Sequence, residues 1–99
     1  MRVRFTDTAE ADLESIADYI AADDVDIAIE FTMDIREACL GLAEYPSRYP
    51  RVPSGVDPLL RRRPFANYLI FYRIHHETVM ISRVVHAARD LKRLEFPDD

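Results

Sequence analysis

A chain of 99 residues has the length of one small domain, and 48% hydrophobic residues with only 2 glycines and 6 prolines exclude a disordered chain. No apolar run approaches the ~20 residues of a membrane-spanning helix, residues 1–8 lack the apolar segment of a signal peptide, and a single cysteine excludes an internal disulfide. We therefore expect a single domain over residues 1–99 that lies in the cytoplasm and makes no membrane contact.

The net charge of −5 is unevenly distributed along the chain. Residues 1–46 contain 12 acidic and 3 basic side chains, whereas residues 47–99 contain 10 basic and 6 acidic ones. Because an acidic protein repels phosphate backbones, we expect no direct, sequence-specific nucleic-acid binding by this chain alone. The basic half could still contact an anionic surface or an acidic segment of a partner. Alternatively, the arginines are ordinary surface residues and the acids cover a solvated helical hairpin.

The first 20 residues predict a short strand followed by a helix. Residues 2–6 alternate polar and apolar side chains, as in a half-buried strand. Asp7, with Glu10 three positions later, fits the pattern of a helix cap. Apolar residues then recur at helical spacing, namely Leu13, Ile16, Ala17 and Ile20. Acids such as Asp12 lie between them, and we expect these to face mostly outward.

A second helix is predicted over residues 25–44. Asp23 and Asp24 interrupt the first helix and offer a cap for the second. The apolar stripe expected of one helix packed along another consists of Ala28, Phe31, Ile35, Ala38 and Leu42. The short connection predicts an antiparallel hairpin. Cys39, on this second helix, is expected to be a small buried core residue rather than a nucleophile.

Residues 45–58 contain four of the six prolines, so neither a helix nor a central strand can pass through them. We expect an ordered loop that crosses from the helices to the sheet. Tyr45, Tyr49 and Val52 are its candidate apolar anchors.

Three strands are predicted next. Residues 59–65 form a strand in which Pro64 suggests an edge position or a bulge. Residues 67–74 and 79–85 form a hairpin rich in aromatic and β-branched side chains. The expected opposite pairs are Ile74 with Val79, Tyr72 with Ile81, and Ile70 with Arg83. Both faces are apolar near the centre, so one packs on the helices and the other is partly covered; the sequence does not settle which.

The predicted fold class is α+β. An N-terminal antiparallel helical hairpin packs on a small, twisted, mostly antiparallel sheet of three or four strands. Residues 90–96 end the chain as a short helix or tail.

The densest basic run is Arg61, Arg62 and Arg63. On a strand, Arg61 and Arg63 point to one face and Arg62 to the other. Guanidinium groups bind phosphates and carboxylates in a bidentate manner, which suits a nucleic-acid target or an acidic partner segment. The competing interpretation is an edge strand that its charges protect from aggregation.

Arg73, Arg83 and Arg89 lie within or beside apolar strands, where an unpaired arginine is costly. We expect a structural ion pair for at least one of them, with candidate partners in Glu77, Asp90 and the acids of the helices. Arg89, at the exit of the last strand, is the first choice for a functional contact.

His86 could act as a general acid or base beside Arg83 and Arg89 in phosphodiester cleavage. A histidine whose ring bonds a neighbouring carbonyl at a strand end is the more economical interpretation. Tyr72 fits sheet packing, and a half-exposed Tyr72 could also contact a ligand.

Cofactor and metal sites are not expected. His75 and His76 lie in a turn without a convincing third metal ligand. Gly41 and Gly55 stand too far apart to form a phosphate-binding loop.

Two segments together resemble a known family. The first combines Asn67-Tyr-Leu-Ile-Phe-Tyr-Arg73 with Arg83-Val-Val-His-Ala-Ala-Arg-Asp90, and the second is A-x-x-D-L-x-x-I-x-x-Y-I over residues 9–20. Their order and spacing resemble the ParE branch of the RelE/ParE toxins of bacterial type II toxin–antitoxin systems, over nearly the whole chain.

The resemblance implies a helical hairpin on a small twisted antiparallel sheet. RelE-like members cut mRNA on the ribosome, whereas ParE-like members poison DNA gyrase. RelE-like nucleases typically keep an arginine in the strand where this chain has Leu69, and often a tyrosine or histidine near the C-terminus. Arg89 and His86 match the family pattern, but no tyrosine follows Arg89. These departures favour a toxin that acts by binding.

Two functions follow from the resemblance. The first is a non-enzymatic inhibitor of DNA gyrase that a cognate ParD-like antitoxin neutralises in a hetero-oligomer. The second is a ribosome-dependent endoribonuclease with Arg83, His86 and Arg89 as catalytic residues. The residues expected to bind the target or the antitoxin are Arg61, Arg62, Arg63, Tyr72, Arg73, Arg83, His86 and Arg89. A third possibility is a toxin-like fold that only binds its partner.

Overall fold

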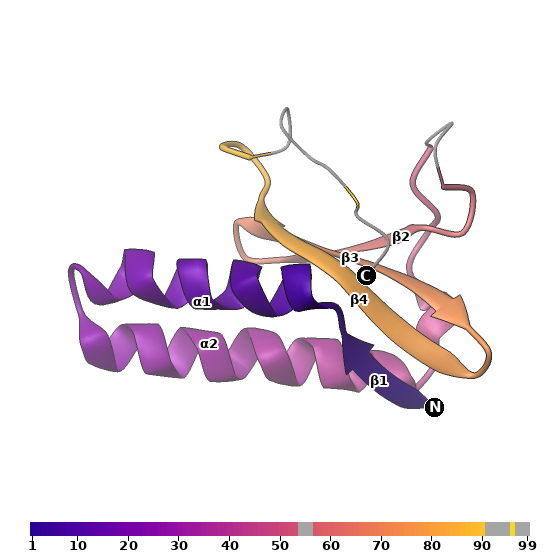
Figure 1. The fold of residues 1–99 in the computed structure, drawn as a ribbon, viewed down its shortest axis with the longest axis horizontal. Helices are drawn as coiled ribbons and strands as arrows, with labels where there is room; N and C mark the ends of the chain where they lie inside the picture. Colours follow the sequence, from indigo (N-terminus) through magenta and orange to yellow (C-terminus); the bar gives the residue numbers. More distant parts are fainter. Residues whose placement is uncertain (54–56, 91–95, 97–99) are drawn as a thin grey trace.

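The computed structural model describes residues 1–53, 57–90 and 96. Within them, two α-helices form a hairpin against one face of a four-stranded sheet (Figure 1). The elements are β1 (Arg2–Phe5), α1 (Asp7–Ala21), α2 (Val25–Leu40), the 3-10 turns η1 (Gly41–Ala43) and η2 (Pro46–Arg48), β2 (Arg61–Phe65), β3 (Tyr68–His75) and β4 (Thr78–His86). The strand order β1-β4-β3-β2 places β1 parallel to β4 and the other neighbours antiparallel. The α+β prediction is confirmed, with a mixed sheet.

Helix α1 is capped by Thr6, so the prediction of an Asp7 cap is wrong. The Thr6 hydroxyl oxygen accepts a hydrogen bond from the Ala9 backbone N–H at 3.0 Å. The same hydroxyl donates to the Ser82 carbonyl of β4 at 3.0 Å, which ties the start of the helix to the sheet. Asp7 is instead the first helical residue, where a carboxylate stabilises the positive end of the helix dipole.

Helix α2 begins as predicted and ends earlier. The Asp24 carboxylate accepts from the Ile27 backbone N–H at 3.0 Å, so the predicted cap is confirmed. The α-helix ends at Leu40 rather than Glu44, because the chain tightens into η1 at Gly41. Tyr45 then adopts a left-handed conformation with φ 54°, and the next residue is a proline, which has no N–H for a helical bond.

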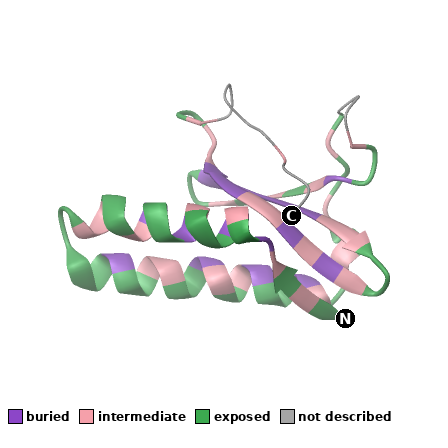
Figure 2. Cartoon of the chain, viewed as in Figure 1, coloured by how far each residue is buried: buried purple, intermediate pink, exposed green. Residues whose placement is uncertain are grey.

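The main core lies between the helices and the sheet. Of the predicted stripe, Ala28, Ile35 and Leu42 are buried, and Phe31 and Ala38 are partly buried against the core. Cys39 is buried, as predicted. The sheet contributes Tyr68, Ile70, Tyr72, Val79, Ile81 and Val84 to this core. A second cluster on the opposite face consists of Leu60, Leu69, Phe71 and Val85, with Val52, Ala87 and Phe96 packed against it. In Figure 2 the buried positions accordingly concentrate on β3, on β4 and where the helices face the sheet.

The β3–β4 hairpin contains an irregularity that changes the register. Ile74 pairs with Val79 and Tyr72 with Ile81, as predicted, but Ile70 pairs with Val84 rather than Arg83. The register shifts between Phe71 and Tyr72, which leaves Ser82 as an extra residue on β4. The shift brings Val84, instead of the expected Arg83, opposite Ile70 and onto the face that packs on the helices.

The turn of this hairpin has left-handed backbone at His76 and Glu77, with φ values of 47° and 58°. Two consecutive positive φ angles match the type I′ turn, whose twist suits the flanking strands. The predicted hairpin connection is therefore confirmed.

Two of the three predicted apolar anchors of the crossing loop pack against the sheet. Tyr49 packs on the main core and Val52 on the second cluster, whereas Tyr45 is 80% exposed and is not an anchor. The Val52 N–H donates to the Leu60 carbonyl at 2.8 Å. Residues 54–56 of this loop, and residues 91–95 of the predicted terminal helix or tail, lie outside the described residues.

Strand β2 is an edge strand, as its proline predicted. The Arg62 N–H points away from β3 and donates to the Pro50 carbonyl at 3.3 Å. Pro64, two residues later, therefore has its ring nitrogen on the same outer side, where a missing N–H costs no sheet bond. Among the described residues, no helix is long and apolar enough to span a membrane.

Candidate binding site at the end of the last strand

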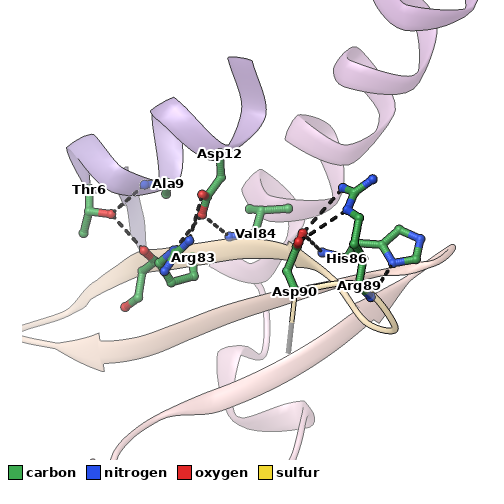
Figure 3. A network of polar contacts seen from close by, with 9 residues as sticks. Thr6, Ala9, Asp12, Arg83, Val84, His86, Arg89 and Asp90 are labelled. Carbon is green, nitrogen blue, oxygen red and sulfur yellow. Dashed lines mark hydrogen bonds and ion pairs between the residues drawn. The ribbon is translucent and has the colours of Figure 1, made fainter. Parts of the chain in front are cut away.

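The predicted site residues fall into two groups and one buried position. Arg83 lies on β4 against Asp12 of α1, and His86 and Arg89 lie at the turn where β4 ends (Figure 3). Arg61, Arg62, Arg63 and Arg73 belong to β2 and β3. Tyr72 is fully buried between the strands and the crossing loop.

Arg83 forms a bidentate ion pair with Asp12 of α1. The distances are 2.9 Å from Nε to Oδ2 and 3.1 Å from Nη2 to Oδ1, and the side chains are only 18% and 15% exposed. The expectation that Asp12 faces mostly outward is therefore wrong. The expected structural ion pair for one of the three arginines is present here.

Asp12 also replaces a missing strand neighbour of β4. Strand β1 ends at Phe5, opposite Ile81, so the next part of the β4 edge has no strand beside it. The Thr6 hydroxyl donates a hydrogen bond to the Ser82 carbonyl, and Asp12 Oδ2 accepts one from the Val84 backbone N–H at 2.9 Å. Side chains of α1 and of its cap therefore supply the hydrogen bonds that a neighbouring strand would make to these backbone groups, which are costly to bury unpaired.

His86 is held by hydrogen bonds to its own chain. Its Nδ1 accepts from the backbone N–H groups of Ala88 at 3.2 Å and Arg89 at 3.1 Å. The ring meets Tyr68 edge-on, with centroids 5.3 Å apart. The expected bond to a carbonyl is therefore replaced by two bonds that the ring accepts. With the Nδ1 lone pair occupied, the neutral ring presents only an Nε2–H donor.

Arg89 combines an ion pair with a ring contact. Its Nε lies 3.3 Å from Asp90 Oδ1. Its guanidinium carbon lies 4.8 Å above the centre of the Tyr19 ring, an arrangement that gives a cation–π attraction. The hydrogen bond to Asp90 raises the pKa of Arg89 above its ordinary value, so the group is a permanent cation.

Asp90 organises this turn. Its Oδ2 accepts from the His86 backbone N–H at 3.2 Å. Partial burial acts to raise the pKa of Asp90, but the hydrogen bonds from Arg89 and from the His86 N–H outweigh it, so that the pKa is lowered. The Asp90 carboxylate is therefore charged at neutral pH and partly neutralises the positive charge of Arg89.

Tyr19 is the site residue that the sequence analysis missed. It lies on α1 and is 64% exposed. The sequence feature that could have identified Tyr19 is an aromatic residue among the outward-facing, mostly acidic positions of an amphipathic helix. An exposed tyrosine with a stacked arginine is the kind of contact that dominates protein interfaces.

Three arginines of the second group lie on the edge strand β2. Arg61 and Arg63 share the face of β2 that points to the helices, and Arg62 is on the other, exposed face, which confirms the predicted alternation. Arg61 donates to the carbonyls of Tyr49 at 2.6 Å and Ser47 at 3.2 Å. Arg63 donates to the Pro64 carbonyl at 2.8 Å and lies 5.3 Å from the centre of the Tyr49 ring.

Arg73 and Tyr72 both bond to the crossing loop. Arg73 pairs with Asp57 of the crossing loop at 3.3 Å, a partner that the sequence analysis did not consider. Tyr72 is 0% exposed, and its hydroxyl donates to the Pro46 carbonyl at 2.6 Å. Burial raises the pKa of the Tyr72 hydroxyl. A half-exposed Tyr72 that contacts a ligand is therefore excluded, because the ring fills the core.

Leu69 adds no polar group to the site. Leu69 is 8% exposed and packs with Leu60 and Phe71 on the face opposite the helices. In residues 1–53, 57–90 and 96, no three His, Cys, Asp or Glu side chains are grouped as a metal site requires. The described arrangement offers fixed cations and aromatic rings, which suit binding.

A family model described as "ParE toxin of type II toxin-antitoxin system, parDE" matches residues 3–91. The chain belongs to this ParE toxin family. A sequence comparison with curated proteins gave no match.

Two solved structures of toxin–antitoxin systems share the fold of this ParE-family chain. One belongs to the chromosomal ParDE system of P. aeruginosa: identity is 25%, TM-score 0.75, and the match covers 87% of this chain and 95% of the other. The second is the RelBE2 toxin–antitoxin complex of Mycobacterium tuberculosis, with 27% identity, TM-score 0.66 and coverage of 86% and 95%. Since both a ParDE and a RelBE system share the fold, the fold alone does not separate their activities.

Proposed function

We propose that this ParE-family toxin inhibits DNA gyrase by binding, without cutting RNA, and that a cognate ParD-like antitoxin neutralises it in a hetero-oligomer. The observation that carries the proposal is the engagement of His86. Its Nδ1 accepts two backbone N–H groups, so no free lone pair on the neutral ring can take the proton of an attacking hydroxyl.

The neighbouring cations support the same conclusion. Arg83 uses its guanidinium fork on Asp12, and Arg89 is partly neutralised by Asp90. Phosphoryl transfer needs unpaired cations directed at the reacting phosphate together with an acid–base pair. The position of the RelE-like arginine is Leu69, whose side chain packs in an apolar cluster.

The exposed surface favours a protein partner. Arg89 stacked on Tyr19 provides an aromatic ring and a fixed cation together at the exit of β4. The exposed Arg62 lies at the other edge of the sheet. We propose that the target and the antitoxin use these arginine groups, with Arg89 as the first contact.

Supercoiling of relaxed plasmid by purified gyrase tests the proposal. The wild-type protein should inhibit the reaction and accumulate cleaved DNA, and the co-expressed antitoxin should reverse both effects. Arg89→Ala should weaken inhibition about tenfold, the loss expected for one interface arginine. Arg4→Ala, which removes an exposed arginine of β1 outside both groups, is the matched control and should inhibit like the wild type.

Ribosome-dependent mRNA cleavage is the decisive counter-experiment. A folded protein that leaves supercoiling untouched but cuts ribosome-bound mRNA, and loses this activity in His86→Ala, would overturn the proposal. It would restore the ribonuclease alternative with Arg83, His86 and Arg89.

A further inference from the structure

Five arginines gather at one corner of the sheet, where the crossing loop runs beside the start of β2. Residues 45–53 and 59–65 contain five arginines and no acidic residue. The two segments are neighbours, because Arg51 lies opposite Arg61 in an antiparallel bridge. We call this surface the β2 corner, and its members are Arg48, Arg51, Arg61, Arg62 and Arg63.

The charges of the β2 corner are not neutralised within the described part of the protein. The four ion pairs between described residues use other arginines, namely Arg36, Arg73, Arg83 and Arg89. Arg61 and Arg63 donate to backbone carbonyls, which carry no net charge. Since a guanidinium group keeps its proton in proteins, the β2 corner presents five positive charges without a carboxylate beside them.

Tyr49 brings three of these cations together. The guanidinium carbons of Arg48 and Arg63 lie 5.1 and 5.3 Å from the centre of the Tyr49 ring. Arg61 Nη1 donates to the Tyr49 carbonyl at 2.6 Å. Like charges held this close repel one another, and a bound anion removes the repulsion. Because guanidinium forks bind phosphate oxygens in a bidentate manner, the arrangement is a preformed site for phosphate groups.

Protection of an edge strand against aggregation does not account for this surface. Arg48 and Arg51 lie outside β2, in η2 and in the segment that follows it. The crossing loop already covers the start of the β2 edge, because the Val52 N–H donates to the Leu60 carbonyl at 2.8 Å. Charges on the loop are not needed to shield an edge that the loop itself covers.

The β2 corner fits an extended polyanion better than an acidic peptide. Arg61 and Arg63 share one face of β2 and Arg62 lies on the other, so the cations surround the edge of the sheet. Duplex DNA carries one negative charge for about every 1.7 Å of its axis, so several phosphates meet these cations at once. A protein partner needs free apolar anchors, whereas the rings among these cations, Tyr49 and Phe65, are partly buried against the core.

The net charge of −5 does not prevent this contact. Eleven of the 18 acidic side chains lie in residues 7–40, which form the helical hairpin. The turn of this hairpin and the crossing loop lie at opposite ends of the molecule, whose longest extent is 38 Å (Figure 1). At physiological ionic strength, charges are screened beyond about 8 Å. The distant acids therefore weaken DNA binding only slightly.

We propose that the β2 corner binds the phosphate backbone of duplex DNA without reading its sequence. The inference rests on the proposed function in one respect, namely that the duplex is the one held by gyrase during inhibition. Arg89 and Tyr19 then contact the gyrase protein, while the β2 corner contacts its DNA. Phosphate contacts position a protein on a duplex and carry no sequence information, so the contact is available at any cleavage site.

DNA binding by the purified full chain tests this inference. The probes are two fluorescent duplexes of about 20 base pairs with unrelated sequences, read by fluorescence anisotropy between about 50 and 200 mM salt. Both duplexes should bind equally, with a Kd on the order of micromolar or weaker at physiological salt. A plot of log binding constant against log salt concentration should have a slope of about −4, the value for four or five neutralised phosphates.

Two double substitutions change the net charge equally. Arg51→Gln with Arg62→Gln removes two exposed cations of the β2 corner, and Arg2→Gln with Arg4→Gln removes two exposed cations of β1. The first pair should weaken DNA binding at about 50 mM salt by about tenfold or more and reduce the salt slope by about 2. The second pair should change the affinity no more than about twofold. Circular dichroism checks that both variants remain folded.

A gyrase experiment connects the β2 corner with inhibition. Labelled toxin should bind gyrase that carries a DNA duplex at least about threefold more tightly than gyrase alone, because a second contact is made to the same complex. The Arg51→Gln and Arg62→Gln variant should lose this difference and keep its affinity for gyrase alone.

Three results would contradict the inference. The first is an equal loss of DNA binding in the two double variants. The second is a salt slope near zero for the wild type. The third is a polyglutamate peptide that binds the β2 corner as tightly as the duplex, which would make an acidic protein segment the occupant.

Failure of the proposed function gives a different pattern. Wild-type protein that binds DNA through the β2 corner but leaves supercoiling unaffected would contradict gyrase inhibition and retain the DNA contact. Normal inhibition without any binding to DNA would contradict the DNA contact alone.

Discussion

Asp12 and Arg83, 71 positions apart in the sequence, are joined at 2.9 Å where α1 crosses the edge of β4. The same carboxylate accepts the Val84 backbone N–H. One acidic side chain therefore neutralises the arginine within the sheet and completes the edge that the short β1 leaves unpaired. The arginine that the sequence marked as a functional candidate is, in this position, part of the framework of the site.

Replacing Asp12 by alanine should lower the free energy of unfolding by about 2–4 kcal/mol, because Arg83 and the Val84 N–H both lose their acceptor. Denaturant unfolding monitored by circular dichroism measures the change. Glu14→Ala, an exposed acid on the same helix, should change it by less than about 0.5 kcal/mol. Equal unfolding midpoints for the two variants would contradict the assigned role of Asp12.

Thr6→Ala should cost about 1–2 kcal/mol, because it removes the cap of α1 and the bond to the Ser82 carbonyl. Thr6→Ser keeps the hydroxyl and should retain most of this stability. Asp7→Ala should cost less than about 1 kcal/mol, since it removes only a charge near the helix dipole. A larger loss from Asp7→Ala than from Thr6→Ala in thermal unfolding would restore Asp7 as the cap.

Cys39 gives a prediction about alkaline stability. Burial raises the pKa of its thiol from 9.0 to about 12, so the folded state keeps the proton that the unfolded chain loses. The protonated thiol contributes fully to the free energy of unfolding below pH 9, and this contribution is lost as the pH rises from 9 to 12. Cys39→Ala should therefore show a smaller decline in unfolding free energy across this window.

Thiol labelling provides an independent readout for Cys39. A thiol reagent at pH 8 should modify the unfolded chain quickly and the folded protein only slowly, since the thiolate is the reactive form. Fast labelling of the folded protein would show that the thiol is accessible and would contradict its buried position.

Leu69→Arg places a guanidinium in the apolar cluster of Leu60, Phe71 and Val85. It should destabilise the protein by about 2–4 kcal/mol without creating ribonuclease activity, because an unpaired charge in this cluster loses its hydration. Unfolding measurements and a ribosome-bound mRNA cleavage assay test the two parts. Stable folding together with newly gained cleavage would show that residue 69 alone separates the two activities.

Local patterns in the sequence determined most of the secondary structure. The Asp24 cap, the β3–β4 hairpin, the edge position of β2 and the burial of Cys39 were predictable because each depends on a few neighbouring residues. The alternation of Arg61, Arg62 and Arg63 followed in the same way from the two-residue repeat of a strand. The family resemblance was also available from the order and spacing of two segments.

The tertiary structure decided which face each strand presents and which charges are paired. One extra residue, Ser82, reverses the alternation along β4, and nothing in its local sequence distinguishes it. The roles of Asp12 and Tyr19 depend on where α1 lies against the end of β4, and Tyr72 is buried because the crossing loop covers it. These contacts join residues far apart in the chain, so packing rather than local periodicity determines them.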